Sequence, residues 1–285
     1  MNYVAPTTVA DAVKILAGAS GPTRVMSGGT DLLVQLRTGR LKPELIIDTK
    51  KIPGIIGITQ NADGGFTIGA ATSGALLGEH TALGAAYPGV VEAANLIGST
   101  QVQGRASLAG NLCNASPAAD SVPAVIAAGG TVTIAGPNGT RTAAVESIVT
   151  GPGKTSLAKG EFITAFHLPP IKGRTGDAYL RFIPRTEMDI AVVGCGVSVT
   201  LDASGTITAA KISLGAVAPT QVLVDPACII GSKLDDAALA RLDAAAQAMC
   251  KPIDDKRGTI EFRTKVAGVL ARRTAAIAVA RAGGR

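Results

Sequence analysis

The stretch Val25-Met26-Ser27-Gly28-Gly29-Thr30-Asp31-Leu32 combines a short apolar strand, a glycine turn and the start of a helix. Successive backbone N–H groups in such a turn can point at an anion, and the dipole of the following helix favours negative charge. The two glycines let the backbone approach a phosphate without interference from a Cβ atom. The pair is adjacent, however, whereas a Rossmann fingerprint needs three spaced glycines.

The residues around this turn form the first of three expected segments, residues 1–54. Thr8 can cap a helix whose apolar residues recur on one face. The run Leu45-Ile46-Ile47 is typical of a buried strand. Helix and strand signals therefore alternate, which predicts a small α/β subdomain.

A second glycine turn, Ile68-Gly69-Ala70-Ala71-Thr72, lies in the next expected segment, residues 55–172. It follows its own short strand, and two such turns could clamp a pyrophosphate from both sides. The same segment contains Asn138-Gly139, a hairpin signal because Asn-Gly accepts positive φ angles. We therefore expect a mixture of strands and helices here.

The stretch from Ala106 to Asp120, in the same segment, has many polar side chains among small residues and no clear helix or strand period. Its polar residues are Ser107, Asn111, Asn114, Ser116 and Asp120. So many donors and acceptors need partners or solvent. The stretch is either a solvated surface loop or backbone held close to a large polar ligand, and the alternation of apolar and small residues favours the ligand.

The last expected segment, residues 173–285, places strands before helices. This order predicts an α+β domain in which helices cover one face of a sheet. The strand-like runs are residues 178–182, 190–201 and 206–217, and the Ala-rich helical stretches are residues 235–249 and 258–282.

Composition and charge disfavour several classes of function. The net charge is +6, but only 3% of residues are aromatic and the basic residues are scattered, which disfavours nucleic-acid binding. We see no N-terminal signal peptide and no apolar stretch of membrane-spanning length, so we expect a cytoplasmic protein without a membrane span. The four cysteines are far apart and there are only two histidines, so no metal site is expected.

Candidate catalytic groups are scarce. The two histidines are His80 and His167, and His167 falls in an expected strand, where packing is the simpler role. No Gly-x-Ser-x-Gly elbow is present, so hydrolase chemistry has no support. The run Gly151-Pro152-Gly153-Lys154-Thr155 imitates the end of a Walker A loop, but Ile148 stands where its first glycine should be. We therefore assign no catalytic residue.

Taken together, these motifs resemble the medium, FAD-binding subunit of the xanthine dehydrogenase and carbon monoxide dehydrogenase family, the molybdenum hydroxylases. The resemblance spans essentially the whole chain, and the motifs in this order and spacing are highly specific. It implies an α+β protein with a vanillyl-alcohol-oxidase (PCMH)-type FAD-binding fold of two α/β subdomains plus a C-terminal α+β domain. Further markers are Tyr3-x-x-Pro6-Thr7-Thr8, Leu45-Ile46-Ile47-Asp48, Gly151 to Thr155, Gly160-Glu161-Phe162-Ile163 and Asp189-Ile190-Ala191-Val192-Val193.

The resemblance also implies which residues bind FAD, noncovalently. The two glycine turns would hold its pyrophosphate, and the polar stretch would meet the flavin, ribityl or ribose groups. Arg181 stands where the family usually has another basic residue, lysine, and Ala71-Thr72-Ser73-Gly74 replaces a common Thr-Thr-His pattern. The implied contacts are Val25, Met26, Ser27, Gly28, Gly29, Thr30, Asp31, Leu32, Ile68, Ala71, Thr72, Ser107, Gly110, Asn111, Asn114, Asp120 and Arg181.

By the same resemblance, the organic substrate is oxidised on another polypeptide. Molybdopterin and [2Fe-2S] clusters would lie on a large and a small partner subunit, assembled with this chain as a dimer of heterotrimers. This chain would pass electrons from the iron–sulfur subunit through FAD to NAD or another acceptor. Two alternatives remain open: an autonomous FAD-dependent oxidase or reductase of the same fold, which should carry its own substrate base, and a flavin-free assembly scaffold, which should have degraded glycine turns.

Overall fold

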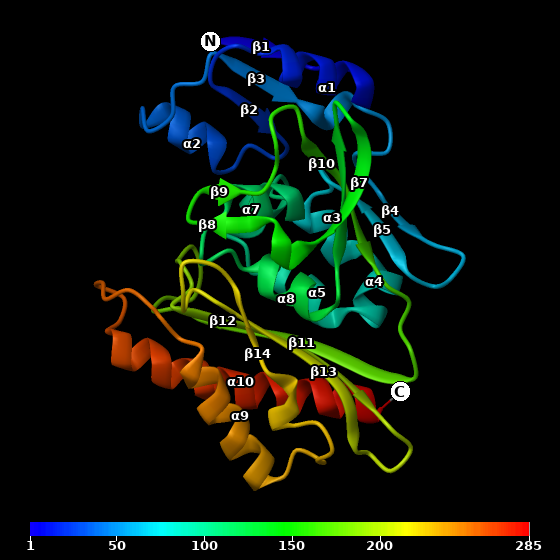
Figure 1. Cartoon of the computed structure of the whole chain (residues 1–285), viewed down its shortest axis with the longest axis vertical. Coiled ribbons are helices and arrows are strands. Elements are labelled where there is room, and N and C mark those ends of the chain that lie inside the picture. The colour runs from blue at the N-terminus through cyan, green and yellow to red at the C-terminus, as the bar shows by residue number, and fades with distance from the viewer. Residues whose placement is uncertain (285) are drawn as a thin grey trace.

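The computed structural model describes residues 1–284 and is drawn in Figure 1. Three sheets follow one another along the long axis: a parallel sheet near the N-terminus, a five-stranded sheet in the centre and a four-stranded sheet near the C-terminus. The expected class, two α/β subdomains followed by an α+β domain, is confirmed. The boundaries at residues 54 and 172 stay predictions.

The N-terminal sheet is small and entirely parallel, with strand order β1–β3–β2. Its central strand β3 is the most buried, as expected for a strand with neighbours on both edges. The side chain of Thr8 accepts a hydrogen bond from the N–H of Asp11, so the predicted helix cap is confirmed. The elements are β1 (Asn2–Val4), α1 (Val9–Gly18), β2 (Thr23–Met26), α2 (Leu32–Arg37), β3 (Leu45–Asp48) and the 3-10 helix η1 (Thr49–Lys51).

The central sheet is antiparallel, with strand order β4–β5–β10–β6–β7. Phe66 and Phe166 are its largest fully buried side chains, and aliphatic residues fill the rest of the core. The predicted hairpin at Asn138-Gly139 joins β6 to β7. The elements are β4 (Ile58–Gln60), β5 (Phe66–Gly69), β6 (Thr131–Gly136), β7 (Gly139–Ala144), η2 (Val145–Ser147), the small hairpin β8 (Val149–Gly151) and β9 (Lys154–Thr155), and β10 (Phe162–Leu168).

Six helices connect β5 to β6, and one of them lies where the sequence showed no helical period. Helix α7 begins after Ser107, whose side chain caps it, and ends at Ala115 with a φ of +49°. Its short length and its glycine and asparagines hide the period, so the sequence pattern did not predict this helix. The helices are α3 (Gly74–Glu79), α4 (Thr81–Ala86), α5 (Pro88–Asn95), α6 (Thr100–Gln103), α7 (Leu108–Asn114) and α8 (Ser121–Ala127).

The C-terminal sheet is antiparallel, and helices cover both of its faces rather than the single face expected. A Cβ atom on Gly176 would lie 2.4 Å from the carbonyl oxygen of Ala278 in α10, and one on Gly196 would lie 2.5 Å from that of Pro123 in α8. These glycines let a helix approach each face closely. The elements are β11 (Arg174–Phe182), β12 (Val193–Leu201), β13 (Ile207–Gly215), β14 (Val222–Val224), η3 (Pro226–Cys228), α9 (Asp236–Ala248) and α10 (Ile260–Gly283).

Strand β11 belongs to both hydrophobic cores of the protein. Tyr179 packs into the core of residues before it, whereas the neighbouring Ala178 packs into the core beneath α9 and α10. Successive side chains of a strand point to opposite faces, so one strand can join the two cores. Across residues 1–284, no helix combines the length and apolarity that a membrane span would require.

Candidate functional site

The glycine turn after β2 packs directly against a distant chain segment. Gly28 and Gly29 are buried, and Gly29 has a φ of +79°, a conformation that favours glycine. A Cβ atom on Gly28 would lie 1.7 Å from the carbonyl oxygen of Arg105. Only glycine therefore fits at position 28, because the backbone before α7 lies where a side chain would be.

Two cationic side chains hold the carbonyl groups of this turn. Lys50 Nζ donates to the carbonyl oxygen of Ser27 at 2.9 Å, and Arg105 Nε donates to that of Gly28 at 3.1 Å. Lys50 is also paired with Asp48 at 2.7 Å, which fixes its ammonium group. The carbonyl groups of the turn are thus satisfied within the protein.

The N–H groups of the same turn are not satisfied. Within residues 1–284, the backbone N–H groups of Gly28, Gly29 and Thr30 donate no hydrogen bond. Buried N–H groups are normally paired, so donors left open on two buried glycines indicate that an acceptor outside the chain belongs here. N–H groups on successive residues of a turn fit an anion such as a phosphate.

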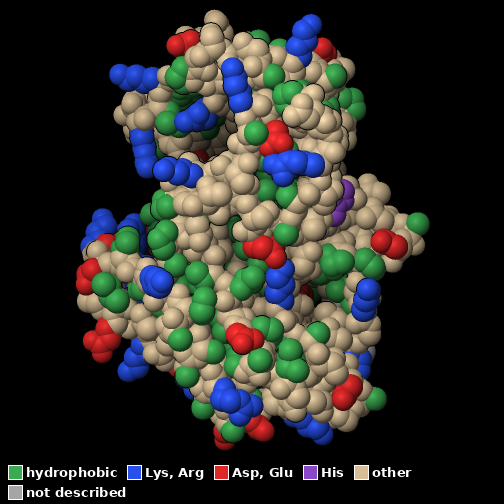
Figure 2. All heavy atoms as spheres, viewed as in Figure 1, with side chains coloured by type: hydrophobic (Ala, Val, Ile, Leu, Met, Phe, Trp, Pro, Cys, Tyr) green, Lys and Arg blue, Asp and Glu red, His purple; other side chains and the backbone are tan. Residues whose placement is uncertain are grey.

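Three segments that are far apart in the sequence meet at this turn. Ser27 Oγ lies 2.7 Å from Ser107 Oγ, and Ser107 Oγ accepts the N–H of Gly110 at 3.1 Å. The carbonyl oxygen of Ala106 accepts the N–H of Gly74 at 2.8 Å, which brings in the residues after the second glycine turn. Figure 2 shows a hollow in the surface at this level, below the N-terminal sheet and on the side of α2.

Two asparagines of α7 fix the walls of this region. Asn111 Oδ1 accepts from the N–H and the hydroxyl of Ser121, at 3.1 and 2.8 Å, and so ties α7 to α8. Asn114 Oδ1 accepts from Gln35 Nε2 at 3.1 Å and so ties α7 to α2. Neither side-chain NH₂ group donates a hydrogen bond within residues 1–284, so both remain able to donate to a ligand.

The comparison with known protein families decides what this site belongs to. Residues 1–171 match the family described as "FAD binding domain in molybdopterin dehydrogenase", and residues 178–278 match "CO dehydrogenase flavoprotein C-terminal domain". The chain belongs to this family. It is a FAD-binding medium subunit of the molybdenum hydroxylase type, an oxidoreductase subunit, as its sequence motifs predicted.

Relatives match this FAD-binding subunit along its whole length. The xanthine dehydrogenase FAD-binding subunit of Escherichia coli O157:H7 is 30% identical over 100% of this chain and 98% of its own. The carbon monoxide dehydrogenase medium chain of Afipia carboxidovorans is 31% identical over 99% and 97%. Among solved structures, the carbon monoxide dehydrogenase of Hydrogenophaga pseudoflava gives a TM-score of 0.94 at 30% identity, covering 99% of this chain and 98% of that one.

The geometry of this FAD-binding subunit fits the group that its family name implies. A dinucleotide carries a pyrophosphate, and the open N–H groups at residues 28–30 face no acceptor of their own. The hollow beside α2 lies next to these groups (Figure 2). The first glycine turn and the walls made by α7 are therefore suited to FAD.

The second glycine turn differs from the first, because its N–H groups already have partners. The N–H groups of Ala70, Ala71 and Thr72 donate to the carbonyl oxygens of Thr164, Ile55 and Gly69. Thr72 Oγ1 is also bonded to Gly57, and Ile68 is fully buried in the core. Cofactor contacts at Ile68, Ala71 and Thr72 stay predictions, and they would have to use atoms other than these N–H groups.

Asp120 and Arg181 contact each other. Arg181 donates to Asp120 Oδ2 at 2.9 Å, and the Tyr179 hydroxyl donates to Oδ1 at 3.2 Å. Burial raises the pKa of Asp120 to about 6, although the Arg181 charge and the two hydrogen bonds act to lower it. Arg181 Nε is buried and has no hydrogen-bond partner among the described residues, so one donor of this group remains open. Flavin contacts by Asp120 and Arg181 stay predictions.

The other predicted contacts surround the first turn. Met26 is buried at the end of β2, whereas Val25 is 37% exposed. Asp31 precedes α2 without a side-chain capping bond, and Leu32 begins that helix half-buried. These positions lie within the segment that carries the open N–H groups, and their individual roles stay predictions.

Sequence reasoning missed three residues that shape the site: Gln35, Lys50 and Arg105. Each is polar and lies within a few residues of a motif that was recognised. Their partners Asn114, Ser27 and Gly28 are 79, 23 and 77 residues away in the chain. Only their closeness to the glycine turn and to the polar stretch could have drawn attention to them.

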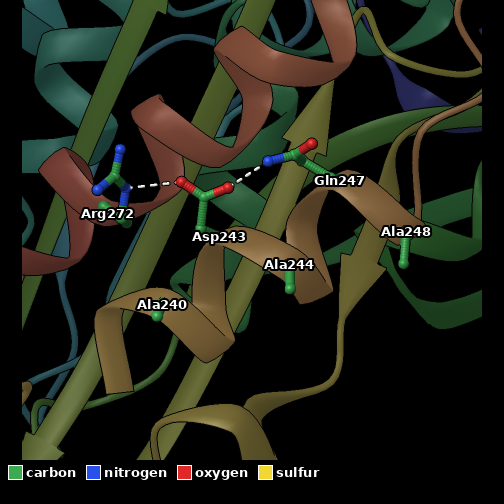
Figure 3. A pocket seen from close by; sticks show the side chains of 6 residues that line it. All are labelled: Ala240, Asp243, Ala244, Gln247, Ala248 and Arg272. Atoms are coloured by element: carbon green, nitrogen blue, oxygen red, sulfur yellow. Dashed lines mark hydrogen bonds and ion pairs between the residues drawn. The ribbon is translucent and has the colours of Figure 1, made fainter. Parts of the chain in front are cut away.

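A second hollow lies between α9 and α10 (Figure 3). It holds about 660 Å³, and three alanines of α9 form much of its lining. Its polar side chains are paired with each other, since Asp243 binds both Arg272 and Gln247. The Asp243–Arg272 ion pair therefore ties α9 to α10 at this hollow.

Both histidines have structural hydrogen bonds. His80 Nδ1 accepts the N–H of Leu83 at the start of α4, and His167 lies between the hydroxyl groups of Thr67 and Thr133. Packing in a strand, the role expected for His167, is confirmed by its place in β10. Among residues 1–284, no cluster of His, Cys, Asp and Glu side chains is arranged to hold a metal ion.

Proposed function

We propose that this FAD-binding subunit is the electron-transfer component of a heteromeric molybdenum hydroxylase. It would receive electrons from a [2Fe-2S] subunit and pass them through FAD to NAD or another acceptor. The organic substrate would be oxidised on a molybdopterin subunit. Support comes from relatives whose names describe medium chains and FAD-binding subunits of such dehydrogenases.

The observation that carries this proposal is that the first glycine turn has paired carbonyl groups and unpaired N–H groups. Its carbonyl groups are held by Lys50 and Arg105, and its N–H groups are open. A flavin-free scaffold would have no need for buried, unpaired donors, which are costly to maintain. The turn therefore favours a cofactor-binding subunit over an assembly scaffold.

The residues of this chain bind and orient the cofactor, and FAD supplies the redox chemistry when bound. The N–H groups at residues 28–30 would hold the pyrophosphate. The NH₂ groups of Asn111 and Asn114 and the open Nε of Arg181 would donate to the polar groups of the remaining cofactor. Asp120 would orient Arg181 through their ion pair.

An autonomous flavin oxidase or reductase is the second candidate, and it requires a base that contacts substrate. The histidines of this chain are engaged in a helix cap and between two strand threonines. Burial raises the Asp120 pKa, yet both of its oxygens are occupied by Tyr179 and Arg181. The two histidines and Asp120 are therefore not placed to act as a free base toward a substrate, so the electron-transfer role is preferred.

The complex would contain an iron–sulfur small subunit and a molybdopterin large subunit, as a dimer of heterotrimers in the cytoplasm. Relatives named as medium chains or medium subunits support a multisubunit assembly. Sedimentation of the co-expressed complex would measure its stoichiometry.

Cofactor analysis tests the proposal. Purified protein should carry one FAD per chain, released in full by denaturation and identified by chromatography as FAD. Protein purified without flavin, and unable to bind added FAD, would overturn the proposal in favour of a scaffold. Flavin that stayed attached to the denatured chain would refute noncovalent binding.

A further inference from the structure

Helix α2 is a helix without a buried residue. Leu33 and Val34 in it are 50% and 60% exposed, respectively. No other helix or strand packs closely along α2, whereas α10 packs along β11 and β12. An apolar surface left open in one chain is often a contact site for another.

The two sides of α2 have different partners. Gln35 is tethered to Asn114 of α7, so the side that carries it faces the cofactor region. At 100° per residue, Leu33, Val34 and Arg37 share the other side of the helix. Val34 therefore faces away from the tether, toward solvent, whereas half-exposed Leu33 also lies near the glycine turn, since its Cγ and Cδ1 would be 3.4 Å from a Cβ atom on Gly29.

The outer side of α2 continues into a basic segment. Arg37, Arg40 and Lys42 are exposed and take part in no ion pair among residues 1–284. No Asp or Glu occurs between Leu32 and Pro43. In Figure 2, Lys and Arg side chains gather on this side of the molecule, beside the hollow.

We propose that the outer face of α2 is a docking surface for a partner subunit whose contact area is apolar at its centre and acidic at its rim. We define the outer face as Leu33, Val34, Arg37, Arg40 and Lys42. Apolar side chains within a charged rim are the usual anatomy of a protein–protein contact. Charge complementarity selects an acidic partner, because the rim carries three unpaired cations.

This surface does not suit a single-stranded nucleic acid. Residues 32–43 contain no aromatic side chain on which a base could stack.

The docking proposal rests on the proposed function, which supplies the partner subunits. It adds where on this chain one of them binds.

The test uses the full chain co-expressed with its iron–sulfur and molybdopterin subunits. The variant Val34→Asp and the double variant Arg37→Glu/Arg40→Glu should each weaken assembly by about tenfold or more, because central apolar anchors and paired charges dominate such contacts. Matched controls are Leu223→Asp on β14, where Leu223 is 41% exposed, and Lys233→Glu in an exposed loop. Both controls should assemble like the wild type.

FAD content, measured on the same preparations, separates this proposal from the proposed function. The α2 variants should keep FAD while they lose partners. Unchanged assembly of both α2 variants would overturn the docking proposal. It would also be overturned if the variants lost FAD and partner subunits to the same extent and added FAD restored assembly. Dimerisation of the isolated chain through α2, or its binding to anionic lipid vesicles, would assign the face to those contacts instead. A wild-type chain that assembles through α2 without any FAD would overturn the proposed function and leave the docking surface in place.

Discussion

The Oγ atoms of Ser27 and Ser107 lie 2.7 Å apart, although 80 residues separate them in the chain. The contact joins the glycine turn after β2 to the capping residue of α7. Each serine also has a local partner, since Ser27 donates to the Ala70 carbonyl and Ser107 accepts from Gly110. The pair therefore sets the distance between the two segments that are expected to hold FAD.

Replacing Ser107 with alanine should weaken FAD binding and lower the stability of the fold. The variant loses both the link to Ser27 and the helix cap, and losing a cap costs about 1 kcal/mol in the free energy of unfolding. Thr259→Ala is the matched control, because Thr259 caps the distant α10 in the same way. Urea unfolding should show a loss for both variants, larger for Ser107→Ala because it also loses the link to Ser27, whereas flavin titration should show weaker binding only for Ser107→Ala. Equal FAD affinity in the two variants would mean that the serine pair has no role in the cofactor site.

Gly28→Ala should impair both folding and FAD binding. Its Cβ would lie 1.7 Å from the Arg105 carbonyl, so the two segments must move apart. Overpacking of this kind typically costs about 1–3 kcal/mol. Gly84→Ala on α4 is the control, because a Cβ there meets no atom within 4 Å. The control should keep its bound flavin and melt at the same or a slightly higher temperature, because alanine is favoured over glycine within a helix. A Gly28→Ala protein that melts normally with full FAD would contradict the close approach.

Removing the cations behind the turn should reduce FAD affinity without unfolding the protein. Arg105→Gln and Lys50→Met each lose a hydrogen bond from a charged donor, worth about 1.5–3 kcal/mol, or roughly 10–100-fold in affinity. Arg105→Lys keeps the charge and should recover part of the loss. Lys51→Met, at the exposed neighbouring position, is the control. Flavin titration measures all four, and equal dissociation constants would show that the carbonyl contacts do not shape the site.

The Asp120 carboxyl predicts a pH dependence of stability. Burial raises its pKa from 3.8 to about 6, against the Arg181 charge and the Tyr179 hydrogen bond. The folded state therefore holds its proton more tightly than the unfolded state, and this contribution to stability falls as the pH rises from about 4 to about 6. Each unit of pKa difference corresponds to about 1.4 kcal/mol, so the loss is at most about 3 kcal/mol.

The variant Asp120→Asn has no titrating carboxyl group at this position, so it is the reference against which the stability of the wild type is compared. The stability of the wild type relative to Asp120→Asn should decline between pH 4 and pH 7, as measured by urea unfolding. A constant difference across that range would place the Asp120 pKa near its ordinary value. A difference that grew with pH would show that the Arg181 charge outweighs burial.

The glycine turn at residues 28–29 and the three-part organisation were predictable because they depend on local signals. Adjacent glycines after an apolar strand, the Asn138-Gly139 hairpin and the Ala-rich helices each act over a few residues. Helix α7 escaped prediction because its capping residue and seven-residue length leave too little periodic pattern. Strand β12 begins at Val193 rather than at residue 190, and Asp189 just before it pairs with Arg185 and with Arg257, which is 68 residues away and could not be linked to it from the sequence.

The sequence indicated which segments form the candidate site, but it did not indicate which side chains and backbone groups are hydrogen-bonded to each other there. The sequence pointed to Ser27, Ser107 and Asn114 as polar residues in glycine-rich surroundings. It could not show that Thr72 is committed to Gly57, because that pairing is set by how β5 returns toward residues 55–57. Lys50 and Arg105 were invisible for the same reason, since their roles depend on tertiary contacts with the turn.

The central claim is that this subunit transfers electrons and does not oxidise the organic substrate itself. The most direct measurement follows flavin absorbance when purines, aldehydes, N-heterocycles or carbon monoxide are added anaerobically to the isolated, FAD-loaded chain. The account predicts a flavin that dithionite reduces but none of these substrates does, and substrate-dependent reduction once the iron–sulfur and molybdopterin subunits are added. Steady turnover of any of these substrates by the partner-free chain would contradict it and identify an autonomous flavoenzyme.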